Sequence, residues 1–180
     1  MEKSRVLKNN AGNAAKNSDF LKVLLIEDSD TDAFLIQRAL RRHMKNASCQ
    51  RVATLGEGEK ILERGWADIV LLDLGLPDTA GVVDTYERLK KWTDSIPIVI
   101  TTRLDDHDVA KNMVHDGAAD FVNKDAIAKD SKRVMDAVDF ALERHAMHKK
   151  LISDKEDALQ DSRQKDSILN CFMGGYSVLK

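Results

Sequence analysis

The chain has 180 residues, enough for one well-buried domain and an appendage but too few for two ordinary domains. Its 28 basic and 30 acidic residues give a net charge of −2, so no overall positive field indicates nucleic-acid binding. The two cysteines lie far apart and predict reduced thiols rather than a disulfide framework. No apolar run approaches the roughly 20 residues of a membrane span, and the N-terminus lacks a signal-peptide pattern. We therefore expect a cytoplasmic protein that does not bind membranes.

A segment without periodicity precedes the first strand pattern. Residues 1–20 are rich in Asn, Ala, Lys and Ser, and we expect them to be disordered. The unbroken apolar runs that follow are typical of strands buried on both faces of a sheet. Five strands are predicted, near residues 23–26, 51–55, 68–72, 98–101 and 119–122. Asp30 or Thr31 is expected to cap the first helix, other helices are expected near 57–64, 82–92 and 106–115, and a long helix follows from about Ser131.

The alternation of strand and helix patterns predicts an α/β fold, with a five-stranded parallel sheet doubly wound by helices on both faces. We assign this domain to residues 21–146. Residues 147–180 differ because charged residues dominate, apolar residues are sparse, and neither Pro nor Gly occurs before Gly174. They are expected to extend the last helix as a charged C-terminal segment.

Polar side chains follow four of the predicted strands. Because ligands in open parallel sheets bind beyond the carboxyl ends of the strands, these side chains are expected to converge at one edge. They are Glu27 and Asp28 after the first strand, Asp73 after the third, Thr102 after the fourth and Lys124 after the fifth. Crowded carboxylates repel each other, and Mg²⁺ is the oxygen-liganded cation that suits such an exposed site. A carboxylate can also act as a nucleophile toward a phosphoryl group, with the Lys and Thr stabilising the charge.

Four sequence blocks closely resemble the receiver domains of two-component response regulators. They are Leu-Ile-Glu-Asp-Ser at 25–29, Leu-Leu-Asp-Leu-Gly-Leu-Pro-Asp at 71–78 with Gly81, Pro-Ile-Val-Ile-Thr-Thr at 97–102, and Gly-Ala-Ala-Asp-Phe-Val-Asn-Lys at 117–124. The resemblance covers roughly residues 21–146 and implies a flavodoxin-like sheet with strand order 2-1-3-4-5.

The resemblance also implies a role for each residue of the expected site. Asp73 would be the phosphoacceptor. The metal ligands would be Glu27, Asp28, Asp73 and the backbone carbonyl of Gly75. Thr102 would be the switch hydroxyl, Phe121 the aromatic residue that turns inward on activation, and Lys124 the phosphate-contacting lysine. The cofactor implied is Mg²⁺.

Three positions depart from the family pattern. Asp125 stands where the family usually has a proline after a cis peptide bond, and a cis bond before a non-proline residue costs about 2.5–4 kcal/mol. Arg103 stands next to Thr102, where a small residue is usual, and its guanidinium is a candidate cover for the phosphorylation pocket. Phe121 replaces the commoner tyrosine, so no phenol is present to form a hydrogen bond.

These observations predict a signalling protein rather than an enzyme. We expect Asp73 to accept a phosphoryl group from a sensor histidine kinase or a histidine phosphotransfer protein, and the signal to pass to a downstream protein by contact. Only self-phosphorylation and self-dephosphorylation are expected as activities. The alternatives are a receiver-like scaffold that takes no phosphate and a Mg²⁺-dependent phosphatase of the haloacid dehalogenase type. The pattern Asp28-x-Asp30-x-Asp32 resembles the Asp-x-Asp-x-Thr of those phosphatases except in its fifth residue.

The C-terminal segment carries a weak dimerisation pattern. A seam with heptad spacing runs along Val138, Ala141, His145, His148, Ile152, Lys155, Leu159 and Ser162. Its polar members suit a tight coiled coil poorly, so we expect weak homodimerisation through this helix or docking on a partner protein.

Overall fold

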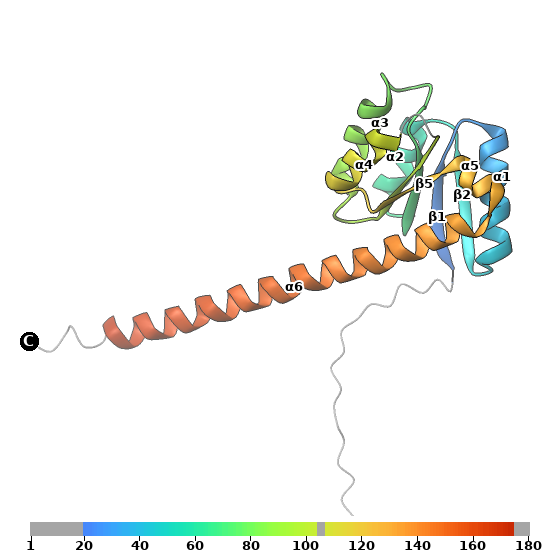
Figure 1. Cartoon of the computed structure of the whole chain (residues 1–180). Coiled ribbons are helices and arrows are strands. Elements are labelled where there is room, and N and C mark those ends of the chain that lie inside the picture. The colour runs from blue at the N-terminus through green and yellow to red at the C-terminus, as the bar shows by residue number, and fades with distance from the viewer. Residues whose placement is uncertain (1–19, 104–106, 175–180) are drawn as a thin grey trace, which may run out of the picture.

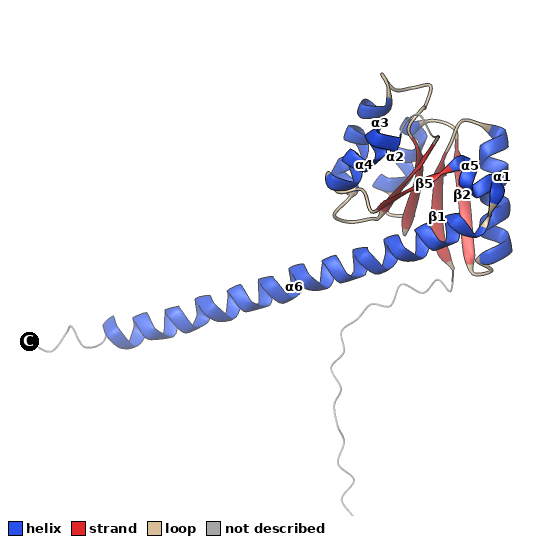
Figure 2. Cartoon of the chain, in the orientation of Figure 1, coloured by secondary structure: helices blue, strands red, loops and turns tan. Residues whose placement is uncertain are grey.

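The computed structural model describes residues 20–103 and 107–174, with the backbone alone for 107–110 and 166–174. Five parallel strands form one sheet in the order β2-β1-β3-β4-β5 (Figures 1 and 2). The strands are β1 Leu21–Ile26, β2 Ala47–Val52, β3 Ile69–Asp73, β4 Ile98–Thr102 and β5 Asp120–Asn123. The predicted fold class and strand order are confirmed. The expectation of disorder concerns residues that, except for Phe20, lie outside the described part of the chain.

Helices cover both faces of the sheet (Figure 2). They are α1 Asp30–His43, α2 Leu55–Glu63, α3 Val82–Leu89 with the short 3-10 helix η1 Lys90–Trp92, α4 His107–His115, α5 Lys124–Lys129 and α6 Lys132–Gly174. Alternate side chains of β1 enter two separate core clusters. Leu24 and Ile26 pack with residues of α2 and α3, whereas Val23 and Leu25 pack with residues of α1 and α6. Burial on both faces explains why β1 and β3 read as unbroken apolar runs.

The edge strand β2 lies four residues earlier than predicted. It spans Ala47–Val52 rather than 51–55, and its residues are exposed or half-buried because it pairs with β1 alone. Its polar residues carry no strong strand pattern. The positions assigned to the end of the predicted strand instead begin α2, where the Thr54 hydroxyl accepts a hydrogen bond from the amide of Glu57 at 3.4 Å.

Two helix boundaries also differ from the prediction. The cap of α1 is Ser29, not Asp30 or Thr31, because the Ser29 hydroxyl accepts from the Asp32 amide at 3.3 Å. Asp30 instead belongs to the first turn, where a negative charge suits the helix dipole. The helix expected over 82–92 consists of α3 and then the tighter 3-10 turn η1.

The chain after β5 forms a helix that the sequence patterns did not predict. The side chain of Asn123 caps α5 by accepting from the Ala126 amide at 3.1 Å, and the buried Ile127 holds this helix against the core. No cis peptide bond occurs among the described residues. The replacement of the family's proline by Asp125 is therefore accompanied by a trans bond and a capped helix.

The last helix, α6, contains 43 residues and begins on the globule. Val134, Ala137, Val138 and Ala141 are buried, whereas every residue from Ala146 to Lys165 is exposed. At 1.5 Å per residue, α6 is about 65 Å long, and Figure 1 shows most of it projecting beyond the sheet. The predicted long helix is confirmed, with Lys132 and Gly174 as its ends. Within the described residues no helix combines the length and apolar character needed to cross a membrane.

Candidate functional site

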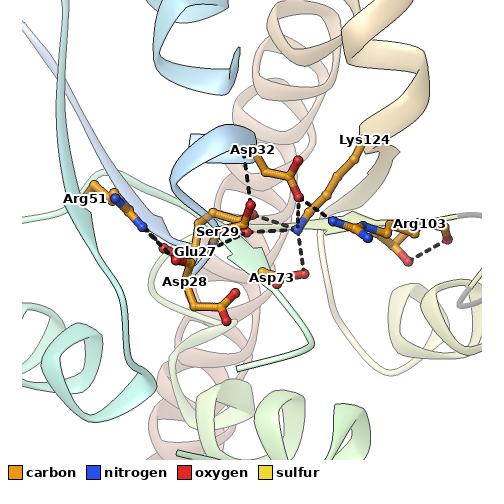
Figure 3. Close-up of polar contacts among 9 residues, drawn as sticks. Glu27, Asp28, Ser29, Asp32, Arg51, Asp73, Arg103 and Lys124 are labelled. Atoms are coloured by element: carbon orange, nitrogen blue, oxygen red, sulfur yellow. Dashed lines mark hydrogen bonds and ion pairs between the residues drawn. The ribbon is translucent and has the colours of Figure 1, made fainter. Parts of the chain in front are cut away.

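The carboxyl ends of the strands bring the predicted polar residues together at one edge of the sheet (Figure 3). Glu27 and Asp28 follow β1, Asp73 ends β3, Thr102 ends β4, and Lys124 begins α5 directly after β5. Parallel strands all point to the same edge, so residues up to 97 positions apart become neighbours.

Three carboxylates form the acidic part of the site. Glu27, Asp28 and Asp73 each offer an oxygen, and these oxygens lie within 4.8 Å of one another. Glu27 is completely buried, the Asp73 side chain is 14% exposed, and Asp28 is exposed. The cluster is therefore closed on the side of Glu27 and open to solvent on the side of Asp28.

Lys124 supplies the central positive charge. Its Nζ lies 3.0 Å from Oε1 and 2.8 Å from Oε2 of Glu27, and 3.0 Å from Oδ1 of Asp73. The Lys124 side chain is only 8% exposed. Burial by itself would lower the lysine pKa, but the hydrogen bond to Glu27 and the charge of Asp73 outweigh it, so the pKa of Lys124 is raised. This lysine therefore remains charged and fixes one oxygen of Asp73.

Burial strongly perturbs the carboxyl group of Glu27. Burial raises its pKa to about 7, the hydrogen bond from Lys124 opposes that rise, and the nearby charge of Asp73 adds to it. The amide of Ser29 also donates to Oε1 of Glu27 at 3.3 Å. Without a further cation, this carboxyl group therefore titrates near neutral pH.

Arg51 holds the loop that carries the acidic pair, and the sequence patterns did not indicate this role. Its Nε donates to the Glu27 carbonyl at 3.0 Å and its Nη2 donates to the Asp28 carbonyl at 2.9 Å. Its Nη1 pairs with Asp30 at 2.5 Å. Arg51 lies near the end of β2, adjacent to β1 in the sheet, so a basic residue at the end of a neighbouring strand was the available signal.

Asp32 and Arg103 form an ion pair beside this cluster. Oδ2 of Asp32 lies 3.1 Å from Nη2 of Arg103 and 3.3 Å from Nζ of Lys124, so it contacts both cations (Figure 3). Burial would raise the pKa of Asp32, but the hydrogen bond from Arg103 and the charge of Lys124 outweigh it and lower the pKa. Arg103 therefore lies beside the site and forms an ion pair with Asp32.

Three further predicted residues, Thr102, Phe121 and Gly75, take no part in the described ion pairs of this cluster. Thr102 is buried and its hydroxyl donates to the Arg103 carbonyl at 3.0 Å. Phe121 is half-buried and packs against the core. A side chain built at Gly75 would begin 3.7 Å from Oδ2 of Asp73, so the backbone of Gly75 lies close to that carboxylate.

The loop after Asp73 is tied to a second helix. Asp78, the last residue of the Leu-Pro-Asp string, accepts hydrogen bonds from the amides of Leu55 and Gly56, both at 2.9 Å. These amides belong to the first turn of α2, which has free donors. Asp78 thereby positions the β3–α3 loop, including Gly75.

The donors present suit a hard divalent cation. Glu27, Asp28 and Asp73 offer oxygen ligands only, and the exposure of Asp28 leaves room for the waters that Mg²⁺ retains. A cation would also offset the repulsion among these three carboxylates, of which Glu27 and Asp73 contact the buried ammonium of Lys124. The residues present therefore fit Mg²⁺.

Comparison with known proteins identifies the family. Residues 23–129 match the response regulator receiver domain family, and the chain belongs to it. The chain is 34% identical over 86 residues to the transcriptional regulatory protein BasR of Escherichia coli, covering 47% of this chain and 37% of BasR. It is 30% identical to the transcriptional regulatory protein KdpE of Staphylococcus aureus, and the match covers 57% of this chain and 43% of KdpE. It is also 30% identical to a cyclic di-GMP phosphodiesterase of Thermotoga maritima, and the match covers 58% of this chain and 27% of the phosphodiesterase. The chain thus spans less than half the length of each of these curated relatives.

Solved structures show the same fold. A response regulator receiver domain protein from Clostridium thermocellum superposes with a TM-score of 0.60 at 24% identity, covering 74% of this chain and 99% of that one. The receiver domain of NtrX from Brucella abortus superposes with a TM-score of 0.59 at 18% identity, and the match covers 67% of this chain and 98% of that one. The expectation of a response regulator receiver is confirmed, and the haloacid dehalogenase alternative belongs to a different family.

Proposed function

We propose that Asp73 accepts a phosphoryl group and that Mg²⁺ bound by Glu27, Asp28, Asp73 and the Gly75 carbonyl is required for the transfer. The observation that carries this proposal is the contact between Nζ of Lys124 and Oδ1 of Asp73, at 3.0 Å, within the carboxylate cluster. When bound, Mg²⁺ would neutralise the carboxylates and attract the oxygens of the phosphoryl group.

The chemical step uses residues of this chain as nucleophile and charge partners. An oxygen of the Asp73 carboxylate attacks the phosphorus atom, the bond from phosphorus to the donor breaks, and an acyl phosphate forms. Lys124 lies where it can donate to the phosphoryl oxygens. Thr102 would exchange its bond to the Arg103 carbonyl for one to the phosphoryl group, and Phe121 would then turn inward.

The partners follow from this chemistry. We propose a sensor histidine kinase or a histidine phosphotransfer protein as donor and a downstream protein as the target of the phosphorylated state. No catalytic activity beyond phosphorylation and dephosphorylation of Asp73 is proposed for the described residues. The scaffold alternative predicts the same surfaces but no acyl phosphate.

Labelling with a small phosphodonor tests the proposal. The purified chain is incubated with acetyl phosphate, with Mg²⁺ or with EDTA, and its mass is measured. One phosphoryl group per chain is expected only with Mg²⁺, and Asp73→Asn should abolish it because the near-isosteric amide lacks the nucleophilic oxygen. Asp94→Asn, at an exposed position in the loop before β4, is the matched control and should be labelled normally. Full labelling of Asp73→Asn would disprove the assignment, and no labelling of the unmodified chain would favour the scaffold.

We further propose that residues 21–146 form the receiver unit and residues 147–180 a separate extension that contacts a second protein. Burial of Val138 and Ala141 removes the first two positions of the predicted seam, and His145 bonds to the Ser95 carbonyl at 3.1 Å. A homodimer through α6 would therefore use only residues from about His148 onward. Sedimentation of the full chain and of a 1–147 truncation tests this. We expect the full chain to dimerise as its concentration rises and the truncation to remain monomeric. If both proteins are monomeric at every concentration, a different protein becomes the proposed partner.

A further inference from the structure

The ion pair between Asp32 and Arg103 has no part in the chemistry described so far, although it lies beside the nucleophile. Asp32 comes from the first turn of α1, and Arg103 immediately follows the switch residue Thr102. Both are held at the site, since Oδ2 of Asp32 contacts Nη2 of Arg103 at 3.1 Å and Nζ of Lys124 at 3.3 Å. Lys124 in turn contacts Asp73.

The charges of the two residues oppose each other in their effect on an incoming phosphodonor. Asp32 adds a carboxylate to a site that already holds Glu27, Asp28 and Asp73, so by itself it would repel an anionic donor. Arg103 neutralises that charge and would by itself attract the donor. Its side chain is 67% exposed, whereas the side chain of Asp32 is 15% exposed, so the cation faces the solvent from which the donor arrives.

We infer that Asp32 and Arg103 form a charge-balanced pair that determines how fast anionic phosphodonors react with Asp73. The inference rests on the proposed function. In the paired state the two charges nearly cancel in the field at Asp73. Loss of Arg103 would leave Asp32 in contact with Lys124 alone, a cation that Asp32 shares with Glu27 and Asp73. Loss of Asp32 would leave the charge of Arg103 without its described partner. The direction of the rate change would depend on which charge remains.

The two single variants should therefore have opposite effects. Arg103→Gln leaves the charge of Asp32 balanced only by the shared Lys124. We expect the rate constant for phosphorylation by acetyl phosphate to fall by about two- to fivefold, the scale of a partly exposed ion pair. Asp32→Asn frees Arg103, and we expect the rate constant to rise by about the same factor. The double variant should return to about the unmodified rate, because a neutral pair replaces a neutral pair.

Two further readouts separate this effect from a structural one. The differences should shrink at high salt, since screening weakens interactions between exposed charges. They should also be smaller with phosphoramidate, which carries less negative charge than acetyl phosphate. As a matched control, Asp161→Asn and Lys165→Gln make the same charge changes in an exposed ion pair of α6, at 2.8 Å, and should leave the rate constant unchanged.

The outcomes are distinguishable. If the unmodified chain takes no phosphate, the proposed function fails and this inference fails with it. If it is labelled but both single variants are slowed equally, with lowered stability against urea, the pair is a structural link between α1 and the end of β4 and the inference is overturned. Unchanged rates in both single variants would also overturn it. Opposite changes that cancel in the double variant would support it.

Discussion

Replacing Lys124 with methionine removes the ammonium that contacts three carboxylates and leaves a side chain of similar length. The contacts to Glu27 and Asp73, at 2.8–3.0 Å, each represent roughly 6 kcal/mol of attraction at an effective dielectric constant of about 20. Much of this attraction is offset by the cost of burying the lysine, and breaking a buried ion pair usually costs about 3–5 kcal/mol. We expect a loss near the lower limit, about 3 kcal/mol, because Glu27 can take up a proton when its partner is removed.

Urea unfolding in EDTA, followed by tryptophan fluorescence, measures this loss. Lys124→Met should unfold at a clearly lower urea concentration than the unmodified chain at pH 8. The double variant Glu27→Gln with Lys124→Met should recover part of the loss, because a neutral amide then replaces the unpaired buried carboxylate. Asp94→Asn again serves as a control for loss of one surface charge.

The pH dependence provides a second check on the same reasoning. Since Lys124 lowers the pKa of Glu27, its removal should raise that pKa above the present value of about 7. At pH 6 the carboxyl group would be largely protonated with or without Lys124, whereas at pH 8 only the variant would have to bury an unpaired charge or take up a proton. The destabilisation should therefore be smaller at pH 6 than at pH 8. An unchanged urea midpoint for Lys124→Met at pH 8, or an equal loss at both pH values, would refute the argument that this lysine compensates a buried charge.

Other predictions concern the metal, the loop that carries its ligands and the pH dependence of the unmodified chain. Asp28→Asn should weaken Mg²⁺ binding on the order of tenfold in calorimetric titrations, and unchanged affinity would contradict its role as a ligand. Arg51→Ala should weaken Mg²⁺ binding severalfold by releasing the β1–α1 loop, with partial recovery in Arg51→Lys, and equal affinities would limit Arg51 to a structural role. The pKa of Glu27 rises on folding from 4.5 to about 7, so the folded state binds the proton more tightly. In EDTA the free energy of unfolding should therefore fall by about 3 kcal/mol as the pH rises from about 4.5 through 7, and Glu27→Gln should remove this dependence.

Residue patterns alone were sufficient to predict the parallel sheet and most of its strands. Strands β1 and β3 are apolar at nearly every position because they are buried on both faces of the sheet. A short, unbroken apolar run is therefore a strong sequence signal for a central strand of a parallel sheet. The same logic predicted where the candidate site would lie, because parallel strands must end at one edge and Asp73 ends one of them. Strand β2 was displaced in the prediction because an edge strand has no such condition on its composition.

The contacts around the candidate site depended on tertiary structure. Arg103 and Asp32 are 71 positions apart, and their pairing depends on the angle at which α1 leaves β1 and on the path of the chain after β4. Arg51 reaches the carbonyls of Glu27 and Asp28 only because β2 pairs with β1 in a particular register. Periodicity reports which face of an element is buried, and it contains no information on how side chains of two different elements meet. The residues of the site were therefore readable from the sequence, whereas their partners were determined by the packing of the elements that carry them.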